Sequence, residues 1–271
     1  MTKKYVFLDI DGTLVDYSGR MPESAERALS AARENGHRLI LCTGRFYSQI
    51  YGWLLDMIPF DGFVTSSGAH VRLDGRTVFT HYFPGDMIRE LRRVCGPLGA
   101  ALMFHTDGHL VTTREELDAA RDFFERSGAG KDACDALFGQ VEFARAEEMD
   151  FIEKAVYYGA KPFAEMRKLF SGFALDPYGY KHLPDTCGEV MPAGVTKALG
   201  ISKLLEYAGA DRADSIGIGD GGNDLEMIKY CGTGVAMGNA SETLKQAADF
   251  VTTPIGEGGI ANAFGRLGLI D

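Results

Sequence analysis

The first residues that could do chemistry are two carboxylates at the end of a short apolar run. Asp9 and Asp11 follow Val6-Phe7-Leu8, and Gly12 comes directly after them. Such a run is typical of a strand buried on both faces, and side chains alternate along a strand, so the two carboxylates start on the same side. Like charges held close repel unless a cation lies between them, and Mg²⁺ takes carboxylate oxygens and suits phosphate substrates. Asp-Gly is also a common turn that needs no metal.

Three further groups of polar residues stand where strands or helices are expected to begin or end. Thr43-Gly44-Arg45 follows the apolar stretch 38–42, and Asp220 with Asn223-Asp224 follows the apolar stretch 215–219. Lys197 opens a stretch with helical spacing. Parallel strands place their carboxyl ends at one edge of a sheet, so these groups could converge there. Each also has a simpler interpretation, as a polar strand end, a solvated helix lysine or a turn.

The order of the expected elements predicts how these groups are positioned. Apolar and helical patterns alternate as strand, helix, strand, helix, strand over residues 5–65, which calls for a parallel sheet with right-handed crossovers. A hairpin is expected around Asp74-Gly75. The section 84–188 mixes hairpins and helices, and the first pattern resumes at Glu189. We therefore expect an α/β fold, a doubly wound parallel sheet formed by 1–83 and 189–271, with an inserted α+β domain at 84–188.

Composition limits the classes of partner. The chain has 271 residues, a net charge of −10 and a pI near 5.1, which disfavours a broad surface for nucleic acid. No apolar stretch reaches the length of a membrane span, and the apolar run after the N-terminus is too short for a signal peptide. The five cysteines never form a C-x-x-C pattern, so we expect reduced thiols and a cytoplasmic protein.

Taken in order, D-x-D-G-T, T-G-R, a lone lysine and G-D-G-x-N-D resemble the motifs of the haloacid dehalogenase (HAD) superfamily. More narrowly, the chain resembles the Cof-type phosphatases of subfamily IIB, whose larger cap (the C2B cap) is inserted between the second and third motifs. The resemblance spans essentially the whole chain. It implies a HAD-like Rossmannoid core and a Mg²⁺-dependent phosphatase that hydrolyses small phosphomonoesters, such as sugar phosphates or phosphorylated cofactors. One departure is Ala198, where the family often has glycine after the lysine.

The resemblance also implies a role for each matching position. Asp9 would be the nucleophile that forms an aspartyl-phosphate, and Asp11 would protonate the leaving oxygen and then deprotonate the attacking water. Lys197 would neutralise charge on the phosphoryl group. The metal ligands would be Asp9, the backbone carbonyl of Asp11 and Asp220, with Asp224 acting on a metal-bound water or on Lys197. The phosphate or substrate contacts would come from Ile10, Gly12, Thr43, Gly44, Arg45, Lys197 and Asn223, and Arg45 could instead pair with a carboxylate.

Two other functions fit the same motifs. A phosphomutase on a similar core would return the phosphoryl group to its sugar, and a phosphate-sensing module would bind without turnover, although a sensor has no need of Asp11. For the phosphatase, we expect a small phosphorylated metabolite as partner, selected by the inserted domain acting as a lid. Nucleic acid and membrane are not expected as partners, and the chain is expected to be a monomer or a weak homodimer.

Overall fold

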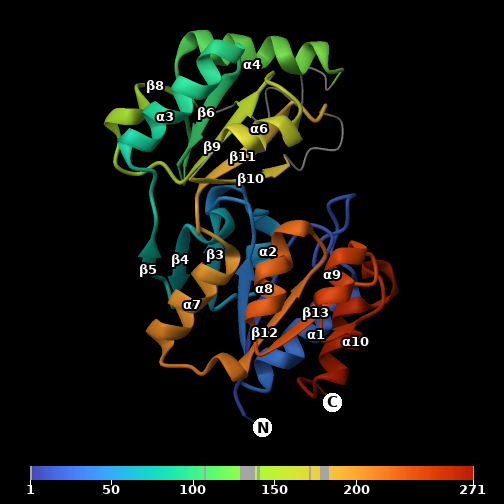
Figure 1. Cartoon of the computed structure of the whole chain (residues 1–271). Coiled ribbons are helices and arrows are strands. Elements are labelled where there is room, and N and C mark those ends of the chain that lie inside the picture. Colours follow the sequence, from blue (N-terminus) through green and yellow to red (C-terminus); the bar gives the residue numbers. More distant parts are fainter. Residues whose placement is uncertain are drawn as a thin grey trace. The chain divides into compact units, whose positions relative to one another are not determined.

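A computed structural model describes residues 2–106, 108–128, 138, 141–170, 172–177 and 183–270 of the chain. The chain divides into two compact units (Figure 1). We call Met1–Thr80 together with Thr196–Asp271 the core unit, and His81–Val195 the inserted unit.

The core unit is built on a sheet that is mostly parallel. Among the described residues eight strands form it, in the order β14-β13-β12-β1-β2-β3-β4-β5. All neighbours from β14 to β3 run parallel, while β4 and β5 form an antiparallel hairpin at the edge. The sequence order reverses between β1 and β12, so the predicted doubly wound α/β fold is confirmed. The strands are β1 (Tyr5–Leu8), β2 (Arg38–Cys42), β3 (Gly62–Thr65), β4 (His70–Leu73), β5 (Arg76–Thr80), β12 (Ser215–Gly219), β13 (Thr233–Ala236) and β14 (Phe250–Val251).

Helices cover both faces of this sheet (Figure 1), which is why every residue of β1 is buried. Helix α1 packs beside α10, and α8 packs beside α7 and α9. In α1 the buried residues recur at helical spacing as Ala25, Ala28, Leu29 and Ala32. The helices of the core unit are α1 (Glu23–Glu34), α2 (Gly52–Met57), α7 (Lys197–Ala208), α8 (Leu225–Tyr230), α9 (Glu242–Ala247) and α10 (Gly259–Arg266).

The hairpin between β4 and β5 is confirmed at the predicted turn. Asp74 has a φ of 50° and Gly75 a φ of 76°. Two consecutive residues with positive φ suit a two-residue hairpin, because this turn matches the right-handed twist of the flanking strands.

The inserted unit contains a second, mixed sheet with the order β10-β11-β9-β6-β7-β8. Its pairs are antiparallel except β7 with β8. Leu102 and Phe104 belong to the cluster formed with α3 and α6, whereas Ala101 and Met103 belong to the cluster formed with α4, because successive side chains of β6 point to opposite faces. The elements are α3 (Gly85–Cys95), β6 (Ala101–His105), β7 (Leu110–Thr112), α4 (Arg114–Arg126), β8 (Val141–Phe143), β9 (Lys154–Tyr158), α6 (Phe163–Leu169), β10 (Phe173–Pro177) and β11 (Cys187–Pro192).

The structure differs from the sequence prediction at the return to the core unit. We expected the core pattern to resume at Glu189. Instead this residue lies in β11, which pairs antiparallel with β9 and β10 of the second sheet. A short apolar strand fits either sheet equally well by composition, so only the pairing partner decides where it belongs. The core unit resumes at Thr196, directly before Lys197.

None of the helices in the described part of the chain combines the length and apolar character that crossing a bilayer requires. The four described cysteines, Cys42, Cys95, Cys187 and Cys231, are buried free thiols, while Cys134 lies outside the described residues.

Candidate active site

The parallel strands of the core unit end in polar residues at a single edge of the sheet. Asp9 follows β1, Thr43 follows β2 and Asp220 follows β12. Backbone hydrogen bonds continue the sheet beyond the strands, because Asp9 N donates to Ile218 O (3.0 Å) and Thr43 N donates to Val64 O (2.9 Å). These residues are therefore held by the rigid sheet rather than by free loops.

Three carboxylates meet at this edge. One oxygen of each of Asp9, Asp220 and Asp224 lies within 4.8 Å of the others, and all three residues are buried. Desolvation of the charged form raises the pKa of Asp9 well above its ordinary range, and the charge of Asp224 adds to this effect. Burial and then Asp224 likewise raise the pKa of Asp220 to about 6. The cluster is thus short of positive charge.

Lys197 provides one positive charge to this cluster. It is the first residue of α7, whose N-cap is Thr196, and its side chain is fully buried. Its Nζ donates to Asp9 Oδ1 (2.6 Å) and to Asp224 Oδ1 (2.5 Å). Burial disfavours the charged form of Lys197, but Asp224 and Asp9 outweigh it, so its pKa is raised. These contacts exclude the solvated-lysine interpretation.

One ammonium among three buried carboxylates leaves room for a second cation. Carboxylate oxygens are the donors that hard divalent ions such as Mg²⁺ prefer. The cluster of Asp9, Asp220 and Asp224 could therefore bind a metal ion.

Asp224 has both oxygens engaged already. While Oδ1 accepts from Lys197, Oδ2 accepts from the backbone N–H groups of Asp220 (3.0 Å) and Gly221 (2.9 Å). The Cβ of any side chain at Gly219 would come within 2.4 Å of the Asp224 carboxyl carbon. Asp224 therefore orients both the lysine and the loop that carries Asp220.

Gly12 leaves space for the carboxylate of Asp220, a contact that the sequence analysis did not predict. We expected Gly12 to contact the phosphate, and the structure shows in addition that a Cβ there would lie 2.2 Å from Asp220 Oδ2. Its φ of 87° also favours glycine. Thr13 Oγ1 donates to Asp220 Oδ1 (3.2 Å) and Tyr17 Oη donates to Oδ2 (3.3 Å), so the segment that follows β1 holds the carboxylate of Asp220.

Two backbone carbonyls shape this first loop. Ile10 buries its side chain in the core, and its carbonyl accepts from the N–H groups of Leu14 (2.9 Å) and Val15 (2.8 Å). Asn239, three residues after β13, donates from Nδ2 to Gly12 O (2.8 Å). Asn239 was missed by the sequence analysis, although its place just beyond a parallel strand was a usable signal.

The Asp11 carboxylate points to a different partner, Arg45. The guanidinium binds it with two parallel hydrogen bonds, Nε to Oδ2 (2.7 Å) and Nη2 to Oδ1 (2.8 Å). Arg45 therefore pairs with a carboxylate, which was one of the two roles considered for it. Tyr51 supports the pair, because its hydroxyl accepts from Arg45 Nη2 (2.7 Å) and its ring lies 4.4 Å from the guanidinium carbon. No sequence signal pointed to Tyr51.

A strained turn lies beside Thr43-Gly44 and was also missed. Ser66 and Ser67, directly after β3, have φ values of 50° and 55°. Each such residue costs about 1–2 kcal/mol unless it is glycine. Ser66 N donates to Arg45 O (2.8 Å) and Ser67 N donates to Thr43 O (3.1 Å), so the turn braces the second motif. Asn223 approaches the same place, since its Nδ2 would lie 3.6 Å from a Cβ on Gly44.

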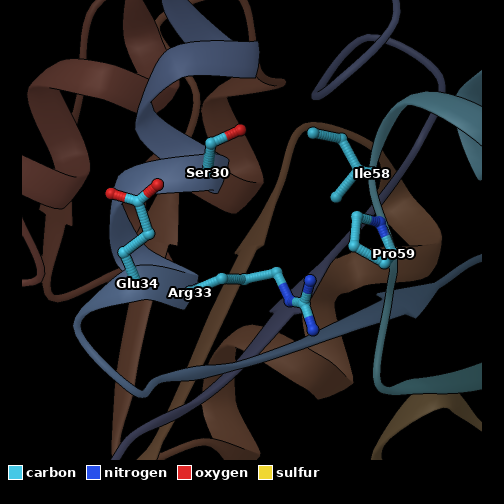
Figure 2. A pocket seen from close by; sticks show the side chains of 5 residues that line it. All are labelled: Ser30, Arg33, Glu34, Ile58 and Pro59. Atoms are coloured by element: carbon cyan, nitrogen blue, oxygen red, sulfur yellow. The ribbon is translucent and has the colours of Figure 1, made fainter.

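A surface pocket of about 330 Å³ lies elsewhere in the core unit (Figure 2). Ser30, Arg33 and Glu34 from the end of α1 line it together with Ile58 and Pro59, which follow α2. These segments lead into β2 and β3, so the pocket belongs to the edge where strands begin, not to the edge that carries the carboxylates. None of the predicted site residues lines it.

Comparison with known proteins defines the family to which this chain belongs. A sequence profile described as haloacid dehalogenase-like hydrolase matches residues 6–264, so the chain belongs to this family. Within it the chain is a Cof-like, subclass IIB hydrolase of the phosphatase type.

Three similar proteins illustrate the likeness. YkrA of Bacillus subtilis is 31% identical over 287 aligned residues and the match covers 100% of both chains. YitU of Bacillus subtilis, a 5-amino-6-(5-phospho-D-ribitylamino)uracil phosphatase, is 27% identical and the match covers 96% of both chains. The structure of BT4131, a HAD subclass IIB sugar phosphatase, is 25% identical with a TM-score of 0.80 and covers 99% of this chain and 100% of that one.

Proposed function

We propose that this protein is a Mg²⁺-dependent phosphomonoesterase that acts on a small phosphorylated metabolite through an aspartyl-phosphate on Asp9. The observation that carries the proposal is the buried Lys197, whose ammonium joins Asp9 to Asp224 beside Asp220. Two similar proteins are named as phosphatases of small phosphate esters, one a sugar phosphatase and the other a ribitylaminouracil phosphatase. Their names support this substrate class.

In the proposed first half-reaction, Asp9 attacks phosphorus while the ester P–O bond breaks. Its Oδ1 is bound to Lys197, and no other hydrogen bond to the Asp9 carboxylate occurs among the described residues, so Oδ2 is available for attack. Lys197 and the N–H of Gly44 would neutralise and orient the phosphoryl oxygens, with Thr43 and Asn223 beside them. Asp11 would leave its pairing with Arg45, and in its protonated form would give the proton to the departing alcohol.

In the second half-reaction, Asp11 takes a proton from water, and the water oxygen attacks the phosphoryl group. The bond between phosphorus and Asp9 breaks, which releases inorganic phosphate and restores the carboxylate. A bound Mg²⁺ would be held by Asp9, Asp220 and the backbone carbonyl of Asp11, and would offset the charge of the acids and the phosphate. Asp224 would keep Lys197 in place.

The test is a screen of phosphorylated metabolites with Mg²⁺ that reads released phosphate. We expect release without any bisphosphate activator, which a phosphomutase would need. Asp9→Asn should lower turnover by a factor of about a thousand or more while the fold is retained, because an amide is a poor nucleophile. Acid quenching of the wild-type reaction should leave a phosphoryl group on the peptide that contains Asp9.

The exposed Asp56 on α2 provides the control substitution, since Asp56→Asn removes a carboxylate outside the site. Normal turnover in Asp9→Asn, or no phosphate release from any ester by the wild-type protein, would refute the proposal.

A further inference from the structure

The strained turn after β3 connects the segments that the proposed function uses. Ser67 N donates to Thr43 O (3.1 Å), which ties the turn to the second motif. On its other side, a Cβ at Gly68 would lie 2.0 Å from Thr196 O and 3.2 Å from Lys197 N. The turn is therefore packed between Thr43-Gly44 and the start of α7.

The side chain of Ser67 is directed at the phosphate-binding segment. Its Oγ would lie 3.4 Å from a Cβ on Gly44, and Asn223 Nδ2 would lie 3.6 Å from the same point. The polar side chains of Ser67 and Asn223 thus both lie next to the Cα of Gly44. Among the described residues, no hydrogen bond accounts for the Ser67 hydroxyl.

Folding alone does not favour a serine at this position. With a φ of 55°, Ser67 is in the left-handed region, a conformation that glycine adopts without a steric penalty. The contact that holds the turn to Thr43 comes from the backbone N–H of Ser67, which glycine would keep. Strained residues in a rigid setting cluster at ligand sites, where their side chains have a use that the fold does not supply.

We propose that Ser67 is a phosphate-binding residue, whose hydroxyl donates a hydrogen bond to a phosphoryl oxygen held at the N–H of Gly44. This inference rests on the proposed function and adds a donor to its site. A neutral hydroxyl between Lys197 and Asn223 would fix the orientation of the phosphoryl group without adding charge.

Two substitutions separate the hydroxyl from the backbone. Ser67→Ala removes the hydroxyl and keeps the strain, whereas Ser67→Gly removes both. With Mg²⁺ present, we expect each variant to bind inorganic phosphate and orthovanadate about tenfold more weakly or worse by titration calorimetry, the effect of losing one hydrogen bond to a charged group. Thermal unfolding should nevertheless occur about 2–4 °C higher in Ser67→Gly than in Ser67→Ala. Ser202→Ala, which removes a hydroxyl bound to Leu199 O on α7, should leave phosphate affinity unchanged.

The outcomes distinguish this inference from the proposed function. Affinity within twofold of wild type in either Ser67 variant would overturn the assignment, while phosphate release by the wild-type protein would still stand. Weakening in Ser67→Gly but not in Ser67→Ala would also overturn it, because chain flexibility rather than the hydroxyl would then be responsible. A wild-type protein that neither binds phosphate nor releases it from any ester would overturn the proposed function, and this assignment with it.

Discussion

Replacing Asp220 by asparagine should stabilise the metal-free protein while removing its response to metal. Burial and Asp224 raise the pKa of Asp220 from 3.8 to about 6. Two pKa units correspond to about 3 kcal/mol, which is the free energy the folded state loses by keeping this carboxylate ionised. Asparagine carries no charge and still offers an oxygen to the Thr13 hydroxyl, so the neutral side chain avoids this loss.

The sign of the pH dependence follows from the same shift. Because the folded-state pKa is higher than the unfolded one, the folded protein binds the proton more tightly, and the stability that this proton confers is lost as pH rises from about 4 to about 6. At pH 8 in EDTA, Asp220→Asn should therefore be more stable than wild type by up to about 3 kcal/mol, and the difference should vanish near pH 4.

Urea unfolding followed by tryptophan fluorescence measures this directly, because the sole tryptophan, Trp53, lies on α2 of the core unit. Added Mg²⁺ should stabilise the wild-type protein at pH 8 but leave Asp220→Asn almost unchanged. Asp56→Asn, an exposed control, should stay within about 0.5 kcal/mol of wild type throughout. An Asp220→Asn variant less stable than wild type at pH 8 without metal, or a difference independent of pH, would refute the reasoning.

Two further predictions concern the neighbours of this carboxylate. Gly12→Ala should destabilise the core unit by about 2 kcal/mol or more, because the new Cβ would lie 2.2 Å from Asp220 Oδ2 at a φ of 87°. The same substitution should abolish the effect of Mg²⁺ on urea unfolding. An unfolding curve identical to that of the wild-type protein would contradict this prediction. Tyr51→Phe keeps the aromatic ring against Arg45 but loses the hydroxyl that positions the ion pair between Arg45 and Asp11. The value of kcat/KM should therefore fall more for alkyl phosphates than for aryl phosphates, because an aryl leaving group needs no proton. Tyr47→Phe, from a tyrosine stacked on Arg72, is the matched control, and equal losses on both esters would contradict the role.

The parts that could be predicted from the sequence depend on spacing along the chain. Asp9, Thr43 and Asp220 each end an apolar run, and alternation of strands with helices is enough to place the ends of parallel strands at one edge. The expected topology allowed Lys197 to lie near them, but only the family resemblance gave it a role, because nothing in its local pattern distinguishes it from a surface lysine.

The parts that could not be predicted depend on contacts between distant segments. Ser67 and Tyr51 matter because of what lies beside them in space, and a serine with positive φ has no reliable sequence signal. The assignment of Glu189 to the core sheet was wrong for a related reason, since strands of similar composition pair in both sheets. Gly12 was predicted as a phosphate contact, and its close approach to the carboxylate of Asp220 is a further contact between distant segments that the sequence analysis did not predict.

Every residue named in the candidate site lies in the core unit, at positions up to 80 or from 196 onward. Substitutions, insertions and drift within the 115 or so residues between them can therefore accumulate during descent without touching the reacting groups. Proteins that share this chemistry would then diverge fastest in sequence within the inserted unit. A phylogenetic tree built from that unit alone should have longer branches than one built from the core unit.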